Sequence, residues 1–327
     1  MIPLDAVDRA LLERLQADFP LTPRPFVALG RSLNLEEAEV LARVRRLKEA
    51  NVIRQISAIF DTRRLGYQST LAAFHVADAA LDDVAAQVSA HPGVSHNYAR
   101  PHHYNLWFTL AVPPGQEVAA EVGRLARRSG VDDWLNRPAL RVFKIRAHFK
   151  LKEGRAPRLV EQTGPARAFT PADVPFVRAL QRDLPVIARP FSGAATDLGL
   201  SEERLLEKAR ELEAAGIVRR FAAVLRHRRV GYTANGMGCW VVPEARIEEV
   251  GRLAAGFPQV SHCYQRPAYP PRWPYNLFTM IHGQSEEEAE EVAAAIAEKT
   301  GIEDYVILYS TTEYKKERVK YFTEGVQ

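Results

Sequence analysis

The chain has 327 residues, 46% hydrophobic and 26% charged, which excludes a disordered or fibrous protein and leaves apolar material for more than one core. Its 44 basic and 40 acidic residues give a net charge of +4, which permits an anionic partner without requiring one. Two cysteines exclude a disulfide framework, and the sequence shows neither a signal peptide nor a run of about 18 apolar residues. We therefore expect a cytoplasmic protein that does not enter a membrane.

The N-terminal part of the chain is predicted to be helical. Apolar residues at positions 4, 7, 11, 12 and 15 follow the period of a helix. A second helix is expected over 36–50, with Val40, Val44 and Leu47 on its apolar stripe and Asn51 at its end. The apolar segment that follows, with a turn at Asp61, predicts a small β-wing. Helices followed by a wing indicate a winged helix-turn-helix.

Strands and helices then alternate. Apolar, β-branched and aromatic patterns predict strands over 69–76, 94–100, 105–112 and 140–150, and helices over 81–90 and 116–129. This βαββαβ order is the ferredoxin-like motif. The fold class expected is therefore α+β.

The whole pattern occurs twice. LQADFP at 15–20 recurs as LQRDLP at 180–185, and PGVSHNYARP at 92–101 recurs as PQVSHCYQRP at 258–267. An insertion, AYPPRWP, lengthens the second copy after Pro267. We therefore expect a tandem duplication. Its parts are winged helix-turn-helix domains over 1–62 and 171–227, ferredoxin-like domains over 63–152 and 228–327, and a linker over 153–170.

One repeated strand carries a polar face. Because side chains alternate along a strand, His96, Tyr98 and Arg100 share one face, opposite Ser95 and Asn97. The second copy repeats this triplet as His262, Tyr264 and Arg266. A half-buried strand histidine is usually only hydrogen-bonded, and common ancestry preserves structural residues too. The triplet alone therefore does not establish a site.

Two further groups distinguish the first copy. His102 and His103 lie at the turn after the strand, where the second copy has no histidine. On the expected last strand, Lys144, Arg146 and Lys150 share one face. Since these groups give the first copy more imidazoles and cations, we expect catalysis there. The second copy is expected to be degenerate, or to close the pocket across a pseudo-twofold interface.

These residues carry a family resemblance. The N-terminal helices, LARVRRLKEANVIRQISAIFDTRRLGY and the βαββαβ pattern resemble the leucine-responsive/AsnC regulators in both copies. The segments HPGVSHNYARPHHYNLWFTL and FPQVSHCYQRPAYPPRWPYNLFTM are similar to the sirohaem decarboxylases of the fused NirD–NirL type. Ordinary regulators have a Gly-Asp hairpin for an amino-acid effector at this position, and this chain has His, Arg and Tyr.

The resemblance implies removal of two acetate carboxyls from sirohaem, giving 12,18-didecarboxysirohaem for haem d1 or an alternative haem route. It implies no cofactor beyond the iron of the substrate. A substrate with eight carboxylates needs guanidinium and ammonium groups, iron accepts an imidazole, and decarboxylation needs a proton donor. His96, His102 and His103 are the expected catalytic residues, and His96 and His102 are the candidates for ligating the iron. The expected substrate-binding residues are Tyr98, Arg100, Tyr104, Lys144, Arg146, Lys150, His262 and Arg266.

The alternative is an AsnC-like DNA-binding regulator that senses a tetrapyrrole or an amino acid. The helix over 36–50 contains Arg43, Arg45 and Arg46, which suit DNA. The corresponding helix of the second copy is acid-rich, and RPF before each helix-turn-helix places a proline where it would disturb a helix start. We therefore expect the helical domains to serve in packing rather than in DNA binding. The sequence leaves open whether the pseudo-dimer pairs again into a homodimer.

Overall fold

A computed structural model describes residues 3–17, 19–145, 167–225 and 234–323. The chain forms two compact units, and each unit combines parts of both copies. The helical unit comprises Met1–Gly66, His148–Val230 and Tyr321–Gln327, and the sheet unit comprises Tyr67–Ala147 and Gly231–Lys320. Each unit therefore contains the corresponding parts of both copies. The predicted limits of the single domains stay predictions.

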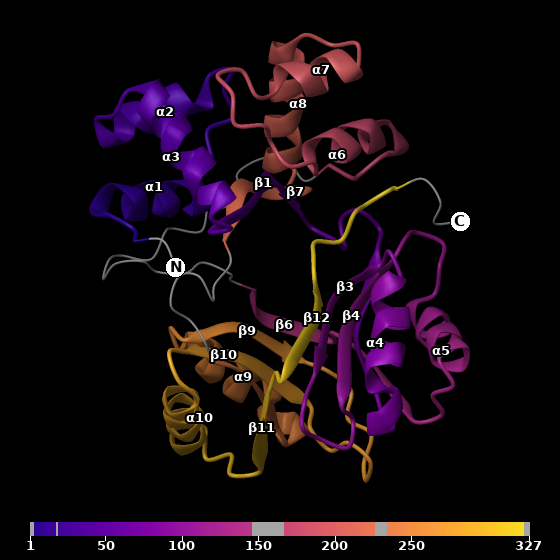
Figure 1. Ribbon diagram of the computed structural model, residues 1–327. Coiled ribbons are helices and arrows are strands. Elements are labelled where there is room, and N and C mark those ends of the chain that lie inside the picture. The colour runs from indigo at the N-terminus through magenta and orange to yellow at the C-terminus, as the bar shows by residue number, and fades with distance from the viewer. Residues whose placement is uncertain (1–2, 18, 146–166, 226–233, 324–327) are drawn as a thin grey trace. The chain divides into compact units, whose positions relative to one another are not determined.

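The helical unit is built from two sets of three helices (Figure 1). The first copy supplies α1 (Ala6–Ala17), α2 (Pro25–Leu33), α3 (Glu37–Glu49) and β1 (Ile53–Phe60). The second copy supplies α6 (Val174–Leu180), α7 (Ser192–Asp197), α8 (Glu202–Ala214) and β7 (Val218–Leu225). The helix expected over 36–50 is confirmed.

The segment expected as a small β-wing forms the strand β1. β1 pairs antiparallel with β7 of the other copy, with Ser57 opposite Ala222, so the two strands join the copies instead of folding back within each copy. The proline argument is wrong for the first copy. Pro25 is the first residue of α2, where a missing N–H costs nothing because that group has no partner within the helix.

The sheet unit holds two five-stranded antiparallel sheets. The first copy contributes β2 (Gln68–Phe74), α4 (Leu81–Ala90), β3 (Val94–Ala99), β4 (Leu106–Val112), α5 (Val118–Arg128), β5 (Trp134–Pro138) and β6 (Arg141–Ile145). The second copy contributes β8 (Ala234–Trp240), α9 (Ile247–Gly256), β9 (Val260–Gln265), β10 (Leu277–Gly283), α10 (Glu286–Thr300), β11 (Tyr305–Tyr309) and β12 (Thr312–Lys316).

The two copies exchange their last strands. The sheet orders are β12-β3-β4-β2-β5 and β11-β8-β10-β9-β6, so β6 of the first copy extends the second sheet and β12 of the second copy extends the first. The described part of the strand expected over 140–150, β6, therefore does not complete its own ferredoxin-like motif. The short strand β5, which the sequence analysis missed, completes it instead. Since each copy lends a strand to the other, the sheet unit is a covalently linked pseudo-dimer.

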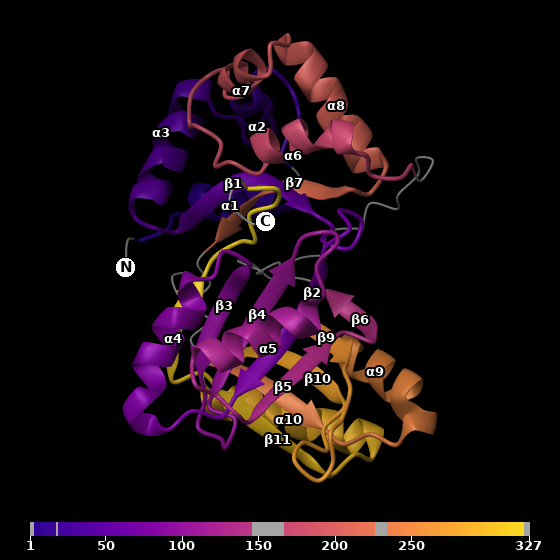
Figure 2. The same cartoon turned by 90° about the vertical axis from the view of Figure 1, so that its right-hand side faces the viewer.

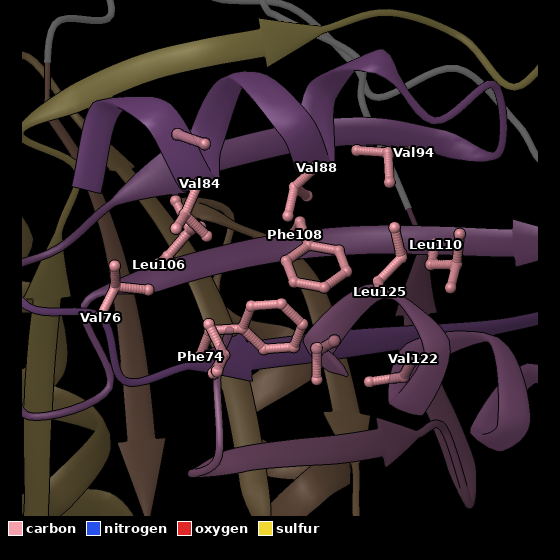
Figure 3. Close-up of a cluster of buried hydrophobic side chains, with 14 of the residues drawn as sticks. Phe74, Val76, Val84, Val88, Val94, Leu106, Phe108, Leu110, Val122 and Leu125 are labelled. Carbon is pink, nitrogen blue, oxygen red and sulfur yellow. The ribbon is translucent and has the colours of Figure 1, made fainter. Parts of the chain in front are cut away.

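Helices cover only the outer face of each sheet. α4 and α5 lie over the first sheet (Figure 2), and their apolar residues pack with Phe74, Phe108 and Leu110 in a buried cluster (Figure 3). α9 and α10 pack in the same way against the second sheet. A further core joins side chains of both sheets, including Trp107, Cys239 and Phe278, so the inner faces approach each other. No helix in the described ranges is long and apolar enough to cross a membrane.

Candidate functional site between the two sheets

The repeated triplets face the space between the sheets. On β3, the rings of His96 and Tyr98 lie 6.2 Å apart, and the guanidinium of Arg100 lies 5.9 Å from the Tyr98 ring. On the opposite face, the side-chain amide of Asn97 donates to the backbone carbonyl of Ala85 in α4. The shared face predicted from alternation is therefore confirmed.

The second copy repeats this arrangement on β9. The His262 and Tyr264 rings lie 6.0 Å apart, and Arg266 lies 4.8 Å from the Tyr264 ring. Burial lowers the pKa of His282, and positive charge at His262 and at Lys316, which lies opposite His96 in the strand register of the first sheet, adds to the effect.

The two ends of the inner layer differ in burial. Side chains around the imidazoles, such as Thr109 and Met280, are half-buried. At the hairpin end, Trp273 from the insertion of the second copy is fully buried and packs 5.0 Å from Trp107, between ring centroids. The insertion therefore closes the hairpin end. The side chains at the end with the strand histidines are less deeply buried than those at the hairpin end.

His282 is a site residue that sequence reasoning missed. Its Nε2 lies 2.6 Å from the Ser261 hydroxyl, which in turn lies 2.8 Å from Nδ1 of His262. Its Nδ1 lies 2.5 Å from Oδ1 of Asn235. Burial, reinforced by positive charge at His262 and Lys316, lowers the pKa of His282 to about 4, so this ring is neutral at pH 7. The second copy thus has an imidazole that the expectation of a degenerate copy did not count.

The repeated arginines cross from one sheet to the other. Nη1 of Arg100 donates to the carbonyl of Leu308 in β11, and Nη1 of Arg266 donates to the carbonyl of Arg137 in β5. Arg100 is 5% exposed, and burial lowers its pKa to about 10, so it stays charged at neutral pH. Each of the two arginines therefore ties one copy to the other, and their predicted contact with substrate carboxylates stays a prediction.

A third buried arginine breaks the symmetry. Arg137 is fully buried, donates through Nη2 to the carbonyls of Pro267 and Tyr275 at 2.8 Å each, and stacks on Trp273. Burial lowers its pKa to about 9. Its Nε and Nη1 have no hydrogen-bond acceptor among the described residues. The equivalent residue on β11 is Leu308. Arg137 therefore anchors the hairpin of the second copy, and Leu308 makes no equivalent guanidinium contact with the hairpin of the first copy.

Side chains of the hairpin between β3 and β4 in the first copy bind the carboxylate of Asp133, which lies just before β5. This carboxylate accepts from Tyr104 and from Nε2 of His103, both at 2.9 Å, and lies 3.3 Å from Arg272. Burial alone would raise the pKa of Asp133, but these partners outweigh it and lower the pKa. Burial also raises the pKa of Tyr104 to about 12. His103 and Tyr104, predicted as site residues, are therefore held in an ion-pair network.

The contacts of His102 are with residues of the two hairpins, Tyr104 and Trp273. Its Nδ1 accepts the backbone N–H of Tyr104 at 3.1 Å, and its ring lies edge-on to Trp273 at 5.2 Å. Burial, with positive charge at His103, lowers the pKa of His102. Since four strand residues span roughly 13 Å, His102 and His103, beyond Arg100, lie well away from His96. The structure does not bring the three predicted catalytic histidines together, and their roles stay predictions.

Replacing Asp133 with asparagine is expected to lower the free energy of unfolding by about 1 kcal/mol at pH 7, because a partly exposed ion-pair network is lost. A carboxylate with a lowered pKa contributes stability above its unfolded pKa of about 3.9 and loses it as the pH falls through the folded value. Urea unfolding at pH 7 and near pH 3 should show the difference between the two proteins shrinking in acid. A difference that does not depend on pH would contradict this network.

The predicted cations of the last strand are only partly described. Lys144 donates to the carbonyl of Phe257 at 2.8 Å, beside α9, because a bulge in the pairing of β6 with β9 turns this side chain to the helical face. It therefore does not share the face of the imidazoles, and its expected role as a carboxylate anchor stays a prediction. Arg146 and Lys150 lie outside the described residues.

Known proteins with the same architecture identify the family. The family model for the AsnC-like ligand binding domain matches residues 64–144 and 229–315, and that for the siroheme decarboxylase NirDL-like HTH domain matches 8–54 and 176–219. A siroheme decarboxylase of Hydrogenobacter thermophilus is 43% identical, with 96% of this chain and 94% of that protein covered. The chain belongs to the sirohaem decarboxylase family.

Two further relatives of the sirohaem decarboxylase family bear on the arrangement of the copies. The beta subunit from Methanosarcina barkeri is 47% identical, and 97% of it matches 45% of this chain, so one copy here corresponds to a whole subunit there. The crystal structure of NirDL in co-complex with an iron-uroporphyrin III analogue has a TM-score of 0.75 and 40% identity, covering 96% of this chain and 94% of that one. The resemblance, fold class and carboxy-lyase activity expected from the sequence are confirmed.

Proposed function

We propose that this protein removes the two acetate carboxyls of sirohaem to give 12,18-didecarboxysirohaem, in haem d1 or an alternative haem synthesis, in the cytoplasm. The observation that carries the proposal is the duplicated His-Tyr-Arg triplet on the inner faces of two strand-exchanged sheets, in a member of this family. The pseudo-dimer brings both copies of the triplet into one unit.

Each reaction breaks the bond between an acetate methylene and its carboxylate. CO2 leaves, the electron pair stays on the methylene carbon and is delocalised into the conjugated macrocycle, and a proton converts the methylene to a methyl group. No redox partner is needed, because electrons and atoms balance with one added proton. We propose that the reaction uses no cofactor beyond the iron of the substrate.

Chain residues would supply the proton and the orientation. His96, half-buried beside Tyr98, suits proton donation, because an imidazole gains and loses a proton near neutral pH. His262 occupies the equivalent place in the second sheet and suits ligation of the substrate iron. The guanidiniums of Arg100 and Arg266 lie on the same faces, where positive charge favours carboxylates.

The test is anaerobic incubation of purified protein with sirohaem, followed by mass spectrometry of the tetrapyrrole. We expect successive losses of one and then two CO2 molecules. A variant with glutamine at both His96 and His262 is the control for non-enzymatic loss. An unchanged tetrapyrrole with the intact protein would contradict the proposal.

We further propose that the helical unit does not bind DNA. On α3, the residues that would face phosphates are already engaged, since Arg43 and Arg46 both pair with the buried Asp8. Lys48 pairs with Asp183 of the other copy at 2.7 Å, and Arg45 donates to the carbonyl of Val186. Breaking these contacts would cost part of the free energy that phosphate binding supplies.

Fluorescence anisotropy with labelled random-sequence duplex DNA should therefore show no binding at micromolar protein and physiological salt, where non-specific binders have dissociation constants of about 10⁻⁴ to 10⁻⁶ M. An AsnC-like regulator serves as the positive control. Binding with the regulator's affinity and salt dependence would favour the DNA-binding alternative.

A further inference from the structure

The two strand histidines have different hydrogen-bond partners although they occupy equivalent places. His96 and His262 each place Nδ1 beside the hydroxyl of the preceding serine, at 3.0 and 2.8 Å. Beyond that serine the copies differ. In the second copy Ser261 also contacts His282, which contacts Asn235, and the register of the strands places Ala111 and Ser69 at the corresponding positions of the first copy.

The hydrogen bonds that link Asn235, His282 and Ser261 in the second copy have a fixed donor-to-acceptor direction. Oδ1 of Asn235 can only accept, so the hydrogen between it and His282 belongs to Nδ1 of that histidine. A neutral imidazole with a hydrogen on Nδ1 accepts at Nε2, so the Ser261 hydroxyl donates to Nε2 of His282. The low pKa of His282, caused by burial, keeps that ring neutral and the direction fixed.

The direction of these hydrogen bonds also determines which nitrogen of His262 carries its hydrogen, because Ser261 contacts both histidines. A serine hydroxyl has one hydrogen, and the contact of Ser261 with His282, at 2.6 Å, is shorter than its contact with the carbonyl of Met280, at 3.4 Å. With that hydrogen committed, the serine oxygen accepts from Nδ1–H of His262. The lone pair of neutral His262 then lies on Nε2. Histidines that ligate metals commonly have this wiring, with the second nitrogen donating to a neighbouring acceptor.

The first copy lacks the two residues that impose this direction. Alanine at 111 cannot accept a hydrogen from Ser95, and His96 is the side-chain partner found for that hydroxyl among the described residues. Ser95 is 7% exposed, so its hydrogen is best satisfied by donation to Nδ1 of His96. Neutral His96 then carries its own hydrogen on Nε2, and its open acceptor position is Nδ1, where uptake of a proton, with the Ser95 hydroxyl turning to accept, gives the imidazolium that a proton donor needs.

We propose that Asn235, His282 and Ser261 are positioning residues that hold His262 in the Nδ1–H form, ready to ligate the substrate iron through Nε2. Neutral His96 is instead held in the Nε2–H form, and a proton taken up at Nδ1 gives the imidazolium that donates from Nε2. The assignment of tautomers rests on the contacts above together with the burial of Ser95 and His282, and the assignment of roles rests on the proposed function. Duplication followed by change at two positions has thus given equivalent histidines opposite tasks.

Long-range ¹H–¹⁵N correlation spectra of the full chain at neutral pH, with ¹⁵N-labelled histidine, test the tautomers without substrate. His262→Gln and His96→Gln assign the two rings. We expect a protonated Nδ1 in His262 and a protonated Nε2 in His96. The reverse pattern in His262, as a flipped Asn235 amide would produce, or the same tautomer in both rings, would overturn the proposal.

A double variant, Asn235→Ser with His282→Ala, gives the second copy the residue pair that the first copy already has. In this variant the His262 pattern should change to that of His96, while unfolding by urea remains a single cooperative transition. The pair Ser69→Ala and Ala111→Gly is the matched control in the first copy and should leave His262 unchanged. A His262 pattern unaffected by the double variant would show that these hydrogen bonds do not set its tautomer.

Binding of ferric iron-uroporphyrin III tests the roles. ¹⁵N hyperfine coupling from labelled histidine should disappear in His262→Gly and persist in His96→Gly, and adding ¹⁵N-labelled imidazole to His262→Gly should restore a ¹⁵N coupling. Coupling that disappears only in His96→Gly would overturn the division of roles while leaving decarboxylation intact. Conversely, the expected tautomers and coupling without loss of CO2 from sirohaem would contradict the proposed function and leave the wiring in place.

Discussion

Replacing His96 with glutamine is expected to lower the rate of CO2 release from sirohaem by about 10²- to 10⁴-fold, the usual contribution of a positioned general acid. Glutamine keeps a hydrogen-bond donor of similar size but cannot deliver a proton to carbon. Since His96 is half-buried beside Tyr98 and opposite Lys316 in the sheet, the change should leave the strand pairing intact. The loss should appear in kcat rather than in KM.

The matched control is His91→Gln. His91 lies just before the same strand, but it bonds to Glu121 and to the N–H of Gly93 on the helical side of the sheet. Its replacement should leave the rate within a factor of a few of that of the unmodified protein. Equal rates for the His96 and His91 variants, measured by release of CO2 under single-turnover conditions, would remove His96 from the chemistry.

Replacing Arg137 with alanine is expected to lower the free energy of unfolding by about 3–5 kcal/mol. The change opens a cavity under Trp273 and leaves the carbonyls of Pro267 and Tyr275 without their donor. Arg137→Leu places the residue of the equivalent strand position there and refills part of the space. It should therefore lose less than the alanine variant, and the difference between the two isolates packing from hydrogen bonding.

Urea unfolding of both Arg137 variants measures these losses, with Arg204→Ala as the control. Arg204 lies on α8 with 65% of its side chain exposed, so its removal should change stability by no more than about 0.5 kcal/mol. An Arg137→Ala protein as stable as the control would contradict the prediction. It would mean that the free energy lost in desolvating the guanidinium equals the free energy gained from its contacts.

Local pattern and internal repetition predicted much of this molecule. The helix at 81–90, the strand bearing His96 and the shared face of each triplet follow from side-chain periodicity, which depends on neighbouring residues alone. The partners of strands do not. The segment around Val142 pairs with β9 of the other copy, and nothing in its own side-chain pattern indicates that partner. The pattern of β1 likewise indicated a wing and gave no sign that this strand pairs with β7 of the other copy.

The missed site residues divide into two kinds. His282 was visible in the sequence, because comparing the copies position by position sets it against Ala111 on an inner-face position. Arg137 gave the same kind of signal, because the comparison sets it against Leu308, whereas Asp133 corresponds to Asp304 and gave none. An arginine next to proline and an aspartate after a glycine turn are typical surface residues, and only the hairpin of the second copy and the ring of Tyr104 make them buried partners.

The most direct measurement of the central claim is the isotopic composition of the product formed from sirohaem in D2O. The account predicts a tetrapyrrole that has lost two CO2 molecules and gained one deuterium at each new methyl group, because each departing carboxylate is replaced by a proton that exchanges with water through an imidazole. Sirohaem recovered with all its carboxylates after prolonged anaerobic incubation would contradict it.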